Sequence, residues 1–295
     1  MNLTSSQAEQ ILALADRALA ADGCAPLNEE ARFAVAGTRP AEHLIAELDD
    51  QVVGYLQWQP EFSTAQLVVD PHYRRRGLGG ALVEQLIEGL ADPELGLAGA
   101  EVAEWGLWAF GDLPAAQEFT AALGLRPSRT LLVMRRGLTG IRAPELPAGL
   151  TIRGFRPSDQ DALLALNGEA FAGHPEQGAL DADGLAQRMA EDWFDPDGLL
   201  LAFDADGLAG FHWTKLAEPH LGEVYVIGTA TRARGRGYGR ILLDAGLAHL
   251  AAAGATEAVL YVDSAEQIPV RMYKGAGFEL ERRDLLYTKP AQENR

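Results

Sequence analysis

The chain carries one loop pattern twice, and this repeat limits the folds that it can adopt. Residues 65–82 read AQLVVDPHYRRRGLGGAL, and residues 225–242 read YVIGTATRARGRGYGRIL. In each segment a short β-type run is followed by a turn, an arginine- and glycine-rich loop and a helical pattern. Three pairs of positions keep the same offset of 160 residues: Arg74 with Arg234, Gly77 with Gly237, and Gly79 with Gly239. Downstream, ALGL at 122–125 resembles GAGF at 275–278 at an offset of 153 residues. We therefore expect two copies of one domain, each of about 140 residues.

The repeat predicts a first domain at 1–138 and a second at 151–295. Between them TGIRAPELPAGL, at 139–150, contains two prolines and two glycines, a composition that suits an extended linker. The mixed order of strand and helix patterns in each copy predicts an α/β or α+β sheet with helices on both faces. In the first copy we expect helices at 6–20, 27–34, 78–90 and 113–123, and strands at 42–48, 52–59, 64–69, 102–109 and 129–135. In the second we expect helices at 158–170, 181–193, 238–253 and 267–275, and strands at 151–155, 199–204, 208–216, 223–229, 257–262 and 279–288.

The composition excludes several classes of function. Forty-two acidic residues against 25 basic ones give a formal net charge of -17, so binding to nucleic acid or to an anionic membrane is disfavoured. A single cysteine, Cys24, allows neither an intrachain disulfide nor a cysteine-based zinc cluster. The six histidines lack the spacing of known metal motifs, so we expect no metal. No apolar run reaches membrane-spanning length and no signal peptide is evident, which predicts a cytoplasmic chain. We also expect a monomer.

The repeated loop has the chemistry of an anion site. Where a strand turns into a helix, the first amide groups of the helix lack internal partners and the helix dipole favours negative charge. Glycines allow the backbone to approach an anion closely, and arginines add bidentate charge. In an acidic chain the arginines nevertheless gather at this loop: Arg74, Arg75 and Arg76 in the first copy, and Arg232, Arg234, Arg236 and Arg240 in the second. No phosphate-binding P-loop or dinucleotide fingerprint fits these spacings.

The pattern [Q/R]-x-x-G-x-[G/A] between a strand and a long helix resembles the acyl-CoA pyrophosphate loop of the GCN5-related N-acetyltransferase (GNAT) superfamily. Further segments resemble the mycothiol synthases, a family of actinobacterial acetyltransferases with two tandem domains: FAGHPEQG (171–178), WFDPDG (193–198), GFHWTK (210–215), GEVYVIG (222–228) and LYVDSAEQIPVRMYKGAGF (260–278). The resemblance covers nearly the whole chain and is densest over 170–290. It implies two GNAT domains, each with a mixed, mainly antiparallel sheet flanked by helices. It also implies acetyl transfer from acetyl-CoA to the cysteinyl amine of a cysteinyl-glucosamine-inositol conjugate, with no metal.

The resemblance also implies which positions contact acetyl-CoA. In the first copy these are Leu67, Val68, Val69, Arg75, Arg76, Gly77, Leu78, Gly79 and Gly80. In the second copy they are Ile227, Gly228, Thr229, Arg234, Gly235, Arg236, Gly237, Tyr238, Gly239, Arg240, Glu266 and Arg271. Glu266 departs from the asparagine that is frequent in the family, and this puts that one contact in doubt.

Amine acetylation requires a base for the amine, stabilisation of the oxyanion and an acid for the leaving thiolate. Strand alternation places Glu223, Tyr225 and Ile227 on one face, which favours Glu223 as the base, directly or through a water. By resemblance, Tyr273 protonates the coenzyme sulfur and a backbone amide between Ile227 and Thr229 binds the oxyanion. Also by resemblance, the sugar-cysteine substrate contacts Glu29, Glu176, Lys215, Glu223 and Tyr261.

The first copy lacks these groups at the matching positions. The offsets place Ser63 opposite Glu223, Thr120 opposite Tyr273 and Trp108 opposite Tyr261. We therefore expect the first copy to bind acetyl-CoA without efficient chemistry, although an empty structural loop is the alternative. For the whole chain, two alternatives remain: a tandem acetyltransferase for another small amine or a peptide N-terminus, and a non-catalytic acyl-CoA sensor.

Overall fold

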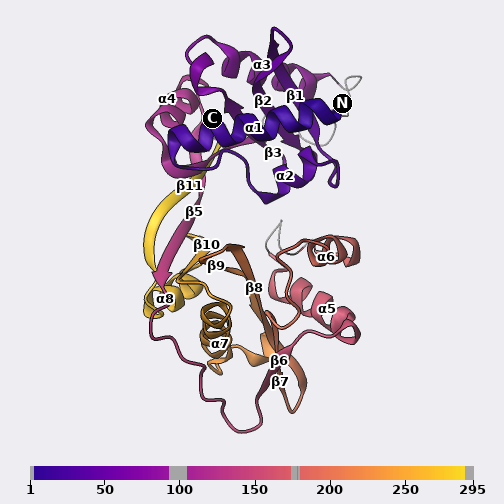
Figure 1. The fold of residues 1–295 in the computed structure, drawn as a ribbon, viewed down its shortest axis with the longest axis vertical. Coiled ribbons are helices and arrows are strands. Elements are labelled where there is room, and N and C mark those ends of the chain that lie inside the picture. Colours follow the sequence, from indigo (N-terminus) through magenta and orange to yellow (C-terminus); the bar gives the residue numbers. More distant parts are fainter. Residues whose placement is uncertain (1–2, 93–104, 174–177, 179, 290–295) are drawn as a thin grey trace, which may run out of the picture. The chain divides into compact units, whose positions relative to one another are not determined.

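The computed structural model describes residues 3–92, 105–173, 178 and 180–289 (Figure 1). The chain divides into two compact units, Met1–Leu131 with Arg282–Arg295, and Leu132–Glu281. Among the described residues, no helix combines the length and the apolarity needed to cross a membrane.

The first unit is a sheet with helices on both faces. Its helices are α1 (Ser5–Asp22), α2 (Glu29–Val35), α3 (Leu78–Ala91) and α4 (Pro114–Ala122). Its strands β1 (Glu42–Leu48), β2 (Gln51–Gln59), β3 (Thr64–Val69) and β4 (Gly106–Ala109) are joined by parts of β5 (Arg126–Gly137) and β11 (Glu279–Thr288), in the order β1-β2-β3-β4-β11-β5. One face packs on α1 and α2 through the core around Leu14, Tyr55 and Val68, and the other packs on α3 through the core around Leu56, Leu82 and Leu86.

The second unit repeats this plan. Its helices are α5 (Gln160–Ala170), α6 (Ala182–Met189), α7 (Tyr238–Ala252) and α8 (Gln267–Gly275). Its strands β6 (Thr151–Gly154), β7 (Leu199–Asp204), β8 (Gly207–Glu218), β9 (Leu221–Thr229) and β10 (Glu257–Asp263) continue from the remaining parts of β11 and β5 in the order β11-β5-β10-β9-β8-β7-β6. Helix α7 covers one face of β8 and β9, while α5 and α6 lie on the opposite side (Figure 1).

The registers confirm the predicted fold class. The described registers of β1-β2, β2-β3, β4-β11, β6-β7, β7-β8 and β8-β9 are antiparallel, while those of β3-β4 and β9-β10 are parallel. Most predicted elements appear within a few residues of their expected bounds. The expected helix at 181–193 was too long, because α6 ends at Met189 and a loop follows. Of the strand expected at 102–109, residues 102–104 lie outside the described residues, and β4 begins at Gly106.

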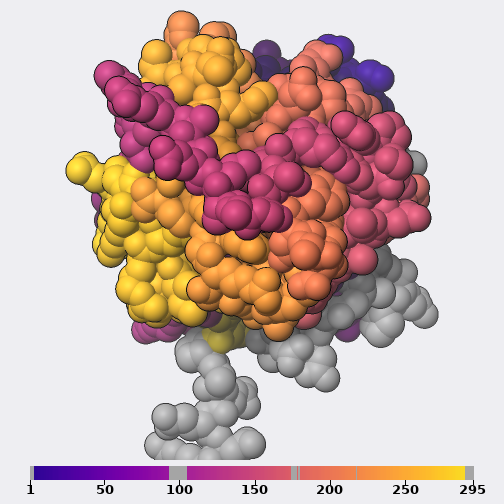
Figure 2. All heavy atoms as spheres, turned by 90° about the horizontal axis from the view of Figure 1, so that it is seen from below, coloured from indigo at the N-terminus to yellow at the C-terminus, as the bar shows by residue number. Residues whose placement is uncertain are grey.

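The contact-defined units differ in their bounds from the sequence repeat. Leu285 and Tyr287 of β11 pair with β4 and enter the core of the first unit, although in sequence they belong to the second copy. Strands β5 and β11 each contribute residues to both units. The proline-rich segment 139–150 lies within the second unit, where Ile141 packs against its core and Leu150 is buried beside Leu242. Figure 2 shows this segment, in magenta, lying across the surface of that unit.

A buried histidine sits under α7 in the second unit. His212 on β8 is fully buried, and its Nδ1 donates to the backbone oxygen of Leu242 at 2.8 Å. Gly246 allows this approach, because a β-carbon there would overlap the imidazole. Within the described part of the chain, the Nε2 atom has no hydrogen-bond partner. Burial lowers the pKa of His212 to about 4, against the raising effect of the bond to Leu242.

Because His212 resists protonation when buried, we expect the stability of the second unit to fall in acid. The unfolded chain takes up a proton at His212 near pH 6.5, whereas the folded chain resists it to about pH 4. The unfolded state therefore binds more protons between these values, so stability falls as the pH is lowered through this window, by about 3 kcal/mol in total. His212→Asn keeps a donor for Leu242 but cannot titrate, so urea unfolding should show a shallower loss of stability in this variant. His220→Asn, in the exposed β8–β9 turn, should retain the wild-type slope. Equal slopes for His212→Asn and the wild type would contradict the assignment.

Candidate active site

The two glycine loops adopt the same backbone conformation. Gly77 and Gly237 precede α3 and α7 with φ of 86° and 80°, in the left-handed region that favours glycine. No side chain of the described residues caps either helix, so the first amide groups of both helices can receive an anion. Gly235 is also left-handed at φ 79°, while its counterpart in the first loop, Arg75, adopts φ 62° as a non-glycine residue. The structure thus supports the predicted equivalence of the two loops.

Carboxylates and carbonyls fix the shape of the second loop. Asp204, at the end of β7, accepts from Arg232 Nη1 at 2.8 and 2.9 Å, and Arg236 Nη1 lies 3.5 Å from the same carboxylate. Arg240 bonds Asp244 and donates to the carbonyl of Gly275 at the end of α8. The side chain of Arg234 is exposed. Of these arginines, Arg240 therefore also ties α7 to α8.

An acidic side chain binds the backbone just before this loop. Glu169, near the end of α5, accepts from the backbone amide of Thr231 at 2.6 Å. That backbone hydrogen bond lowers the pKa of Glu169, with smaller contributions from Arg234 and Arg232. The repeat gave no signal for this contact. In the first loop, Asp22 at the end of α1 instead holds Arg74 through two bonds of 2.6 and 2.7 Å.

A β-bulge in β9 reorganises the face that carries Glu223. On β8, Thr214 pairs with Val224 and Trp213 with Val226, which leaves Tyr225 as an extra residue on β9. Beyond the bulge, Ile227 packs against the α7 side, whereas Tyr225 packs against the core on the α5 side. The expectation that Glu223, Tyr225 and Ile227 share one face was therefore wrong, because one inserted residue reverses the alternation.

The same point marks the end of the parallel ladder between β9 and β10. The register runs from Glu257↔Leu221 to Val259↔Glu223 and stops there, although β9 continues to Thr229 and β10 to Asp263. The two strands thus separate next to Glu223. This gap exposes β9 backbone groups from Val224 onward to a partner other than β10, which suits the pantetheine arm and the oxyanion contact expected at Ile227, Gly228 and Thr229.

Three of the residues expected to contact substrate share one sheet face. Lys215 on β8 and Val259 on β10 pair directly with Glu223 on β9, and Tyr261 lies two residues beyond Val259 on the same strand. Residues in register project to the same face. Alternate residues of β10, such as Leu260, enter the core under α7, so this shared face is the opposite one. Tyr261 remains 46% exposed.

The other residues expected in the site are on α8 or directly before it, on α2 or outside the described residues. Tyr273 on α8 is buried beside Phe278, with ring centroids 5.9 Å apart, and burial raises the pKa of its hydroxyl. Glu266 and Arg271, at the start and middle of α8, are exposed. Glu29 is the first residue of α2 in the first unit, and Glu176 lies outside the described residues.

The first unit contains a cavity at its glycine loop. It has a volume of about 510 Å³ and lies where β3 and β4 separate beyond Gln66↔Trp108. Eight of the nine coenzyme contacts expected in this copy line it: Leu67, Val68, Val69, Arg75, Gly77, Leu78, Gly79 and Gly80. Trp108, Phe110 and Phe119 add an apolar wall, which sequence reasoning did not find. Amides at one end and an apolar wall at the other suit a diphosphate joined to a pantetheine arm.

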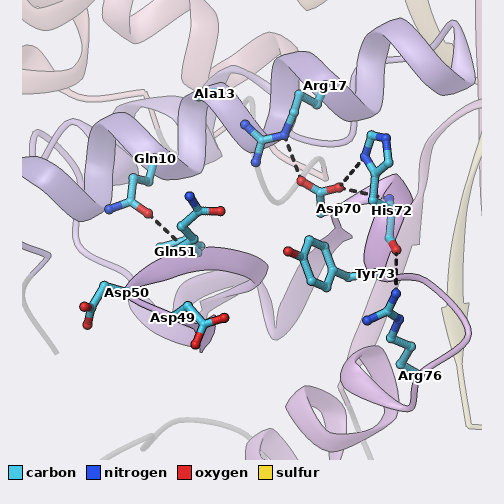
Figure 3. A pocket seen from close by; sticks show the side chains of 11 residues that line it. Gln10, Ala13, Arg17, Asp49, Asp50, Gln51, Asp70, His72, Tyr73 and Arg76 are labelled. Carbon is cyan, nitrogen blue, oxygen red and sulfur yellow. Dashed lines mark hydrogen bonds and ion pairs between the residues drawn. The ribbon is translucent and has the colours of Figure 1, made fainter.

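The ninth residue, Arg76, faces a different and more open hollow of about 1070 Å³ (Figure 3). Arg17 of α1 and Asp70, which follows β3, meet there at 2.8 Å. Burial alone would raise the pKa of Asp70, but hydrogen bonds from His72 and Arg17 outweigh it and hold the pKa below its usual value. Arg76 donates to the carbonyl of His72 and lies 5.1 Å from the Tyr73 ring.

In the residues that the structure describes, the first unit lacks the features expected on the acceptor side of the second. The β2–β3 register runs without a shift, so β3 has no bulge. Ser63 precedes β3, and Thr120 donates its hydroxyl to the carbonyl of Ala116 at 2.8 Å. Gln66, on the face toward α2, is buried and exchanges two 2.9 Å hydrogen bonds with Asn28. Helix α2 is thereby fastened over this part of the face.

Comparison with known proteins agrees with this arrangement. Residues 39–124 match the model described as an acetyltransferase (GNAT) domain, and residues 165–278 match the model of the acetyltransferase (GNAT) family. Both units are thus GNAT domains, and the chain is an acetyl-CoA-dependent N-acyltransferase. A solved GCN5-related N-acetyltransferase from Sphaerobacter thermophilus shares 27% identity and a TM-score of 0.73, over 97% of this chain and 93% of that one.

Curated relatives assign the chain to a specific family of GNAT acetyltransferases. The chain is 42% identical to a mycothiol acetyltransferase of Thermobispora bispora over 97% of both sequences. It is also 42% identical to one of Rhodococcus erythropolis over 98% of both. The chain belongs to the mycothiol acetyltransferase family.

Proposed function

We propose that this chain transfers the acetyl group of acetyl-CoA to the cysteinyl amine of 1D-myo-inositol 2-(L-cysteinylamino)-2-deoxy-glucopyranoside, giving mycothiol and CoA. The name of its relatives supports this acceptor. The observation that carries the proposal is the common face of Lys215, Glu223 and Tyr261 beside the point where β9 and β10 separate. Donors and acceptors there suit a substrate rich in hydroxyl groups.

Acetyl-CoA would bind along the second unit's loop and separated strand. Its diphosphate would lie on the amides that follow Gly235 and Gly237, with Arg234 adding charge. Its pantetheine arm would follow Ile227, Gly228 and Thr229, which places the thioester near Glu223. Tyr238, Gly239, Arg236 and Arg240 complete the loop, and Glu266 and Arg271 are the proposed contacts from α8.

The reaction would proceed by direct attack. Glu223 takes a proton from the acceptor amine, directly or through a water, as the nitrogen forms a bond to the thioester carbon. A backbone amide of the separated β9 strand stabilises the oxyanion. The C–S bond then breaks, and Tyr273, kept protonated by its burial, donates a proton to the sulfur. Tyr273 then recovers a proton from solvent, and Glu223 releases the amine proton to solvent.

The two sequence copies would have different roles. The N-terminal copy, 1–138, would hold acetyl-CoA in its 510 Å³ cavity without catalysing transfer. The C-terminal copy, 151–295, would be catalytic. The absence of a bulge in β3 and the internal hydrogen bond of Thr120 support this division.

This division predicts two acetyl-CoA molecules per chain. Isothermal titration of the wild type should give a stoichiometry of two. Gly80→Asp should reduce it to one, because Gly80 lines the first cavity with open space around it and a carboxylate beside a diphosphate costs several kcal/mol. A stoichiometry of one in the wild type would show that the first loop is empty and structural.

The acceptor is tested by measuring CoA release with a panel of amines. Turnover should be fastest, by kcat/KM, with the cysteinyl-glucosamine-inositol conjugate, and slow with aminoglycosides and peptide N-termini. Faster turnover with another amine would assign a different acceptor to the same fold. No turnover with any amine would favour an acyl-CoA sensor.

A further inference from the structure

The ammonium of Lys215 is held between two aromatic rings. Its Nζ lies 4.7 Å from the centroid of Trp193 and 5.2 Å from that of Tyr225. Both distances fall within the range of a cation–π interaction. Lys215 also pairs in register with Glu223, so this aromatic cage, formed by Trp193 and Tyr225, lies beside the proposed base.

The two walls of the cage are themselves fixed. The Trp193 and Tyr225 rings meet edge to face, with centroids 5.1 Å apart, and Arg188 of α6 donates to the Tyr225 hydroxyl at 2.8 Å. Arg188 in turn donates to the carbonyl of Gly184. Tyr225 is the extra residue of the β9 bulge, and Trp193 lies in the loop beyond the early end of α6. The β9 bulge and the loop after α6 therefore each place one aromatic ring against Lys215.

We propose that Trp193 and Tyr225 are positioning residues that hold Lys215 in place for the hydroxyl-bearing part of the acceptor. The proposal rests on the proposed function, in which Lys215 binds that substrate. A free lysine side chain samples many rotamers and loses them when it binds a ligand. A lysine already held over two rings presents its ammonium donors to sugar or inositol oxygens without that loss. The cage thus affects acceptor affinity, whereas Glu223 affects the chemical step.

The test compares the steady-state kinetics of matched variants. Trp193→Leu should raise KM for the cysteinyl-glucosamine-inositol conjugate about tenfold, which corresponds to about 1.4 kcal/mol, with little change in kcat or in KM for acetyl-CoA. Trp193→Phe keeps a ring face and should restore most of the affinity. Phe194→Leu is the control, because Phe194 contacts Trp213 at a centroid distance of 6.0 Å in the same aromatic cluster. It should leave KM for the acceptor near the wild-type value even if the melting temperature falls.

A double-mutant cycle separates this inference from the proposed function. If Trp193 acts through Lys215, adding Trp193→Leu to Lys215→Met should raise KM no further than Lys215→Met alone. Additive effects, or an equal rise in KM for Phe194→Leu, would overturn the positioning role. If Lys215→Met itself leaves KM for the acceptor unchanged while Trp193→Leu raises it, the proposed contact of Lys215 with substrate fails, and the inference fails with it.

Discussion

Glu223→Gln lowers kcat/KM for the amine acceptor about 10²- to 10⁴-fold near neutral pH, the range that a positioned general base contributes. Glutamine keeps the size and polarity of the side chain but cannot take the proton of the attacking amine. The register of β9 with Lys215 on one side and Val259 on the other should survive, so affinity for acetyl-CoA should be retained. Stopped-time measurement of CoA release at saturating acetyl-CoA gives the rate.

The pH profile distinguishes loss of a base from loss of structure. An α-amino group has a pKa near 8, so without a base the remaining rate should keep rising with pH until the free amine itself predominates. Glu218→Gln changes an exposed glutamate at the end of neighbouring β8 and should leave both rate and profile unaltered. Near-normal turnover of Glu223→Gln with an unchanged profile would remove Glu223 from the mechanism.

Tyr273→Phe should lower kcat about 100-fold or more through loss of the proton donor for the leaving thiolate. The ring remains, so its packing beside Phe278 and the core under α7 should persist. Because burial raises the pKa of the Tyr273 hydroxyl, the group stays protonated through neutral pH, and the defect should be nearly constant across that range. The affinity for acetyl-CoA, measured by titration, should change little.

A second buried tyrosine provides the control for this substitution. Tyr287 of β11 lies in the core of the first unit, and Tyr287→Phe removes a hydroxyl from a residue with the same exposed fraction as Tyr273 without touching the second unit's loop. Turnover should be preserved in this variant. An unaffected rate for Tyr273→Phe would end the acid role, and a matching loss in Tyr287→Phe would point to a general structural effect.

Local sequence patterns predicted the elements that build the proposed coenzyme site. The glycines at 77 and 237 mark helices α3 and α7, because left-handed backbone at those positions favours glycine and the following residues have helical periodicity. The repeat also located the first cavity, since most of the expected contacts line it. Arg76 is the exception: its side chain faces the other hollow, a direction that residue spacing alone does not determine.

Features that depend on pairing between distant segments were not predictable. The bulge at Tyr225 arises from the register with β8, and its local sequence is an ordinary alternating strand. The membership of Leu285 and Tyr287 in the first unit depends on pairing with β4, about 180 residues earlier. The short α6 places Trp193 in a loop against Lys215, whereas the helical pattern continued to that residue. In all three departures, tertiary contacts override the local preference of the sequence.

In the proposed function, the loop at 234–240 and the separated strand β9 together hold acetyl-CoA with its acyl carbon beside Glu223. A structure of the chain with acetyl-CoA bound would test this arrangement. The diphosphate should lie on the main-chain amides after Gly235 and Gly237, and the thioester should lie between β9 and β10. A second unit with this loop vacant, or with the coenzyme bound elsewhere, would contradict this arrangement.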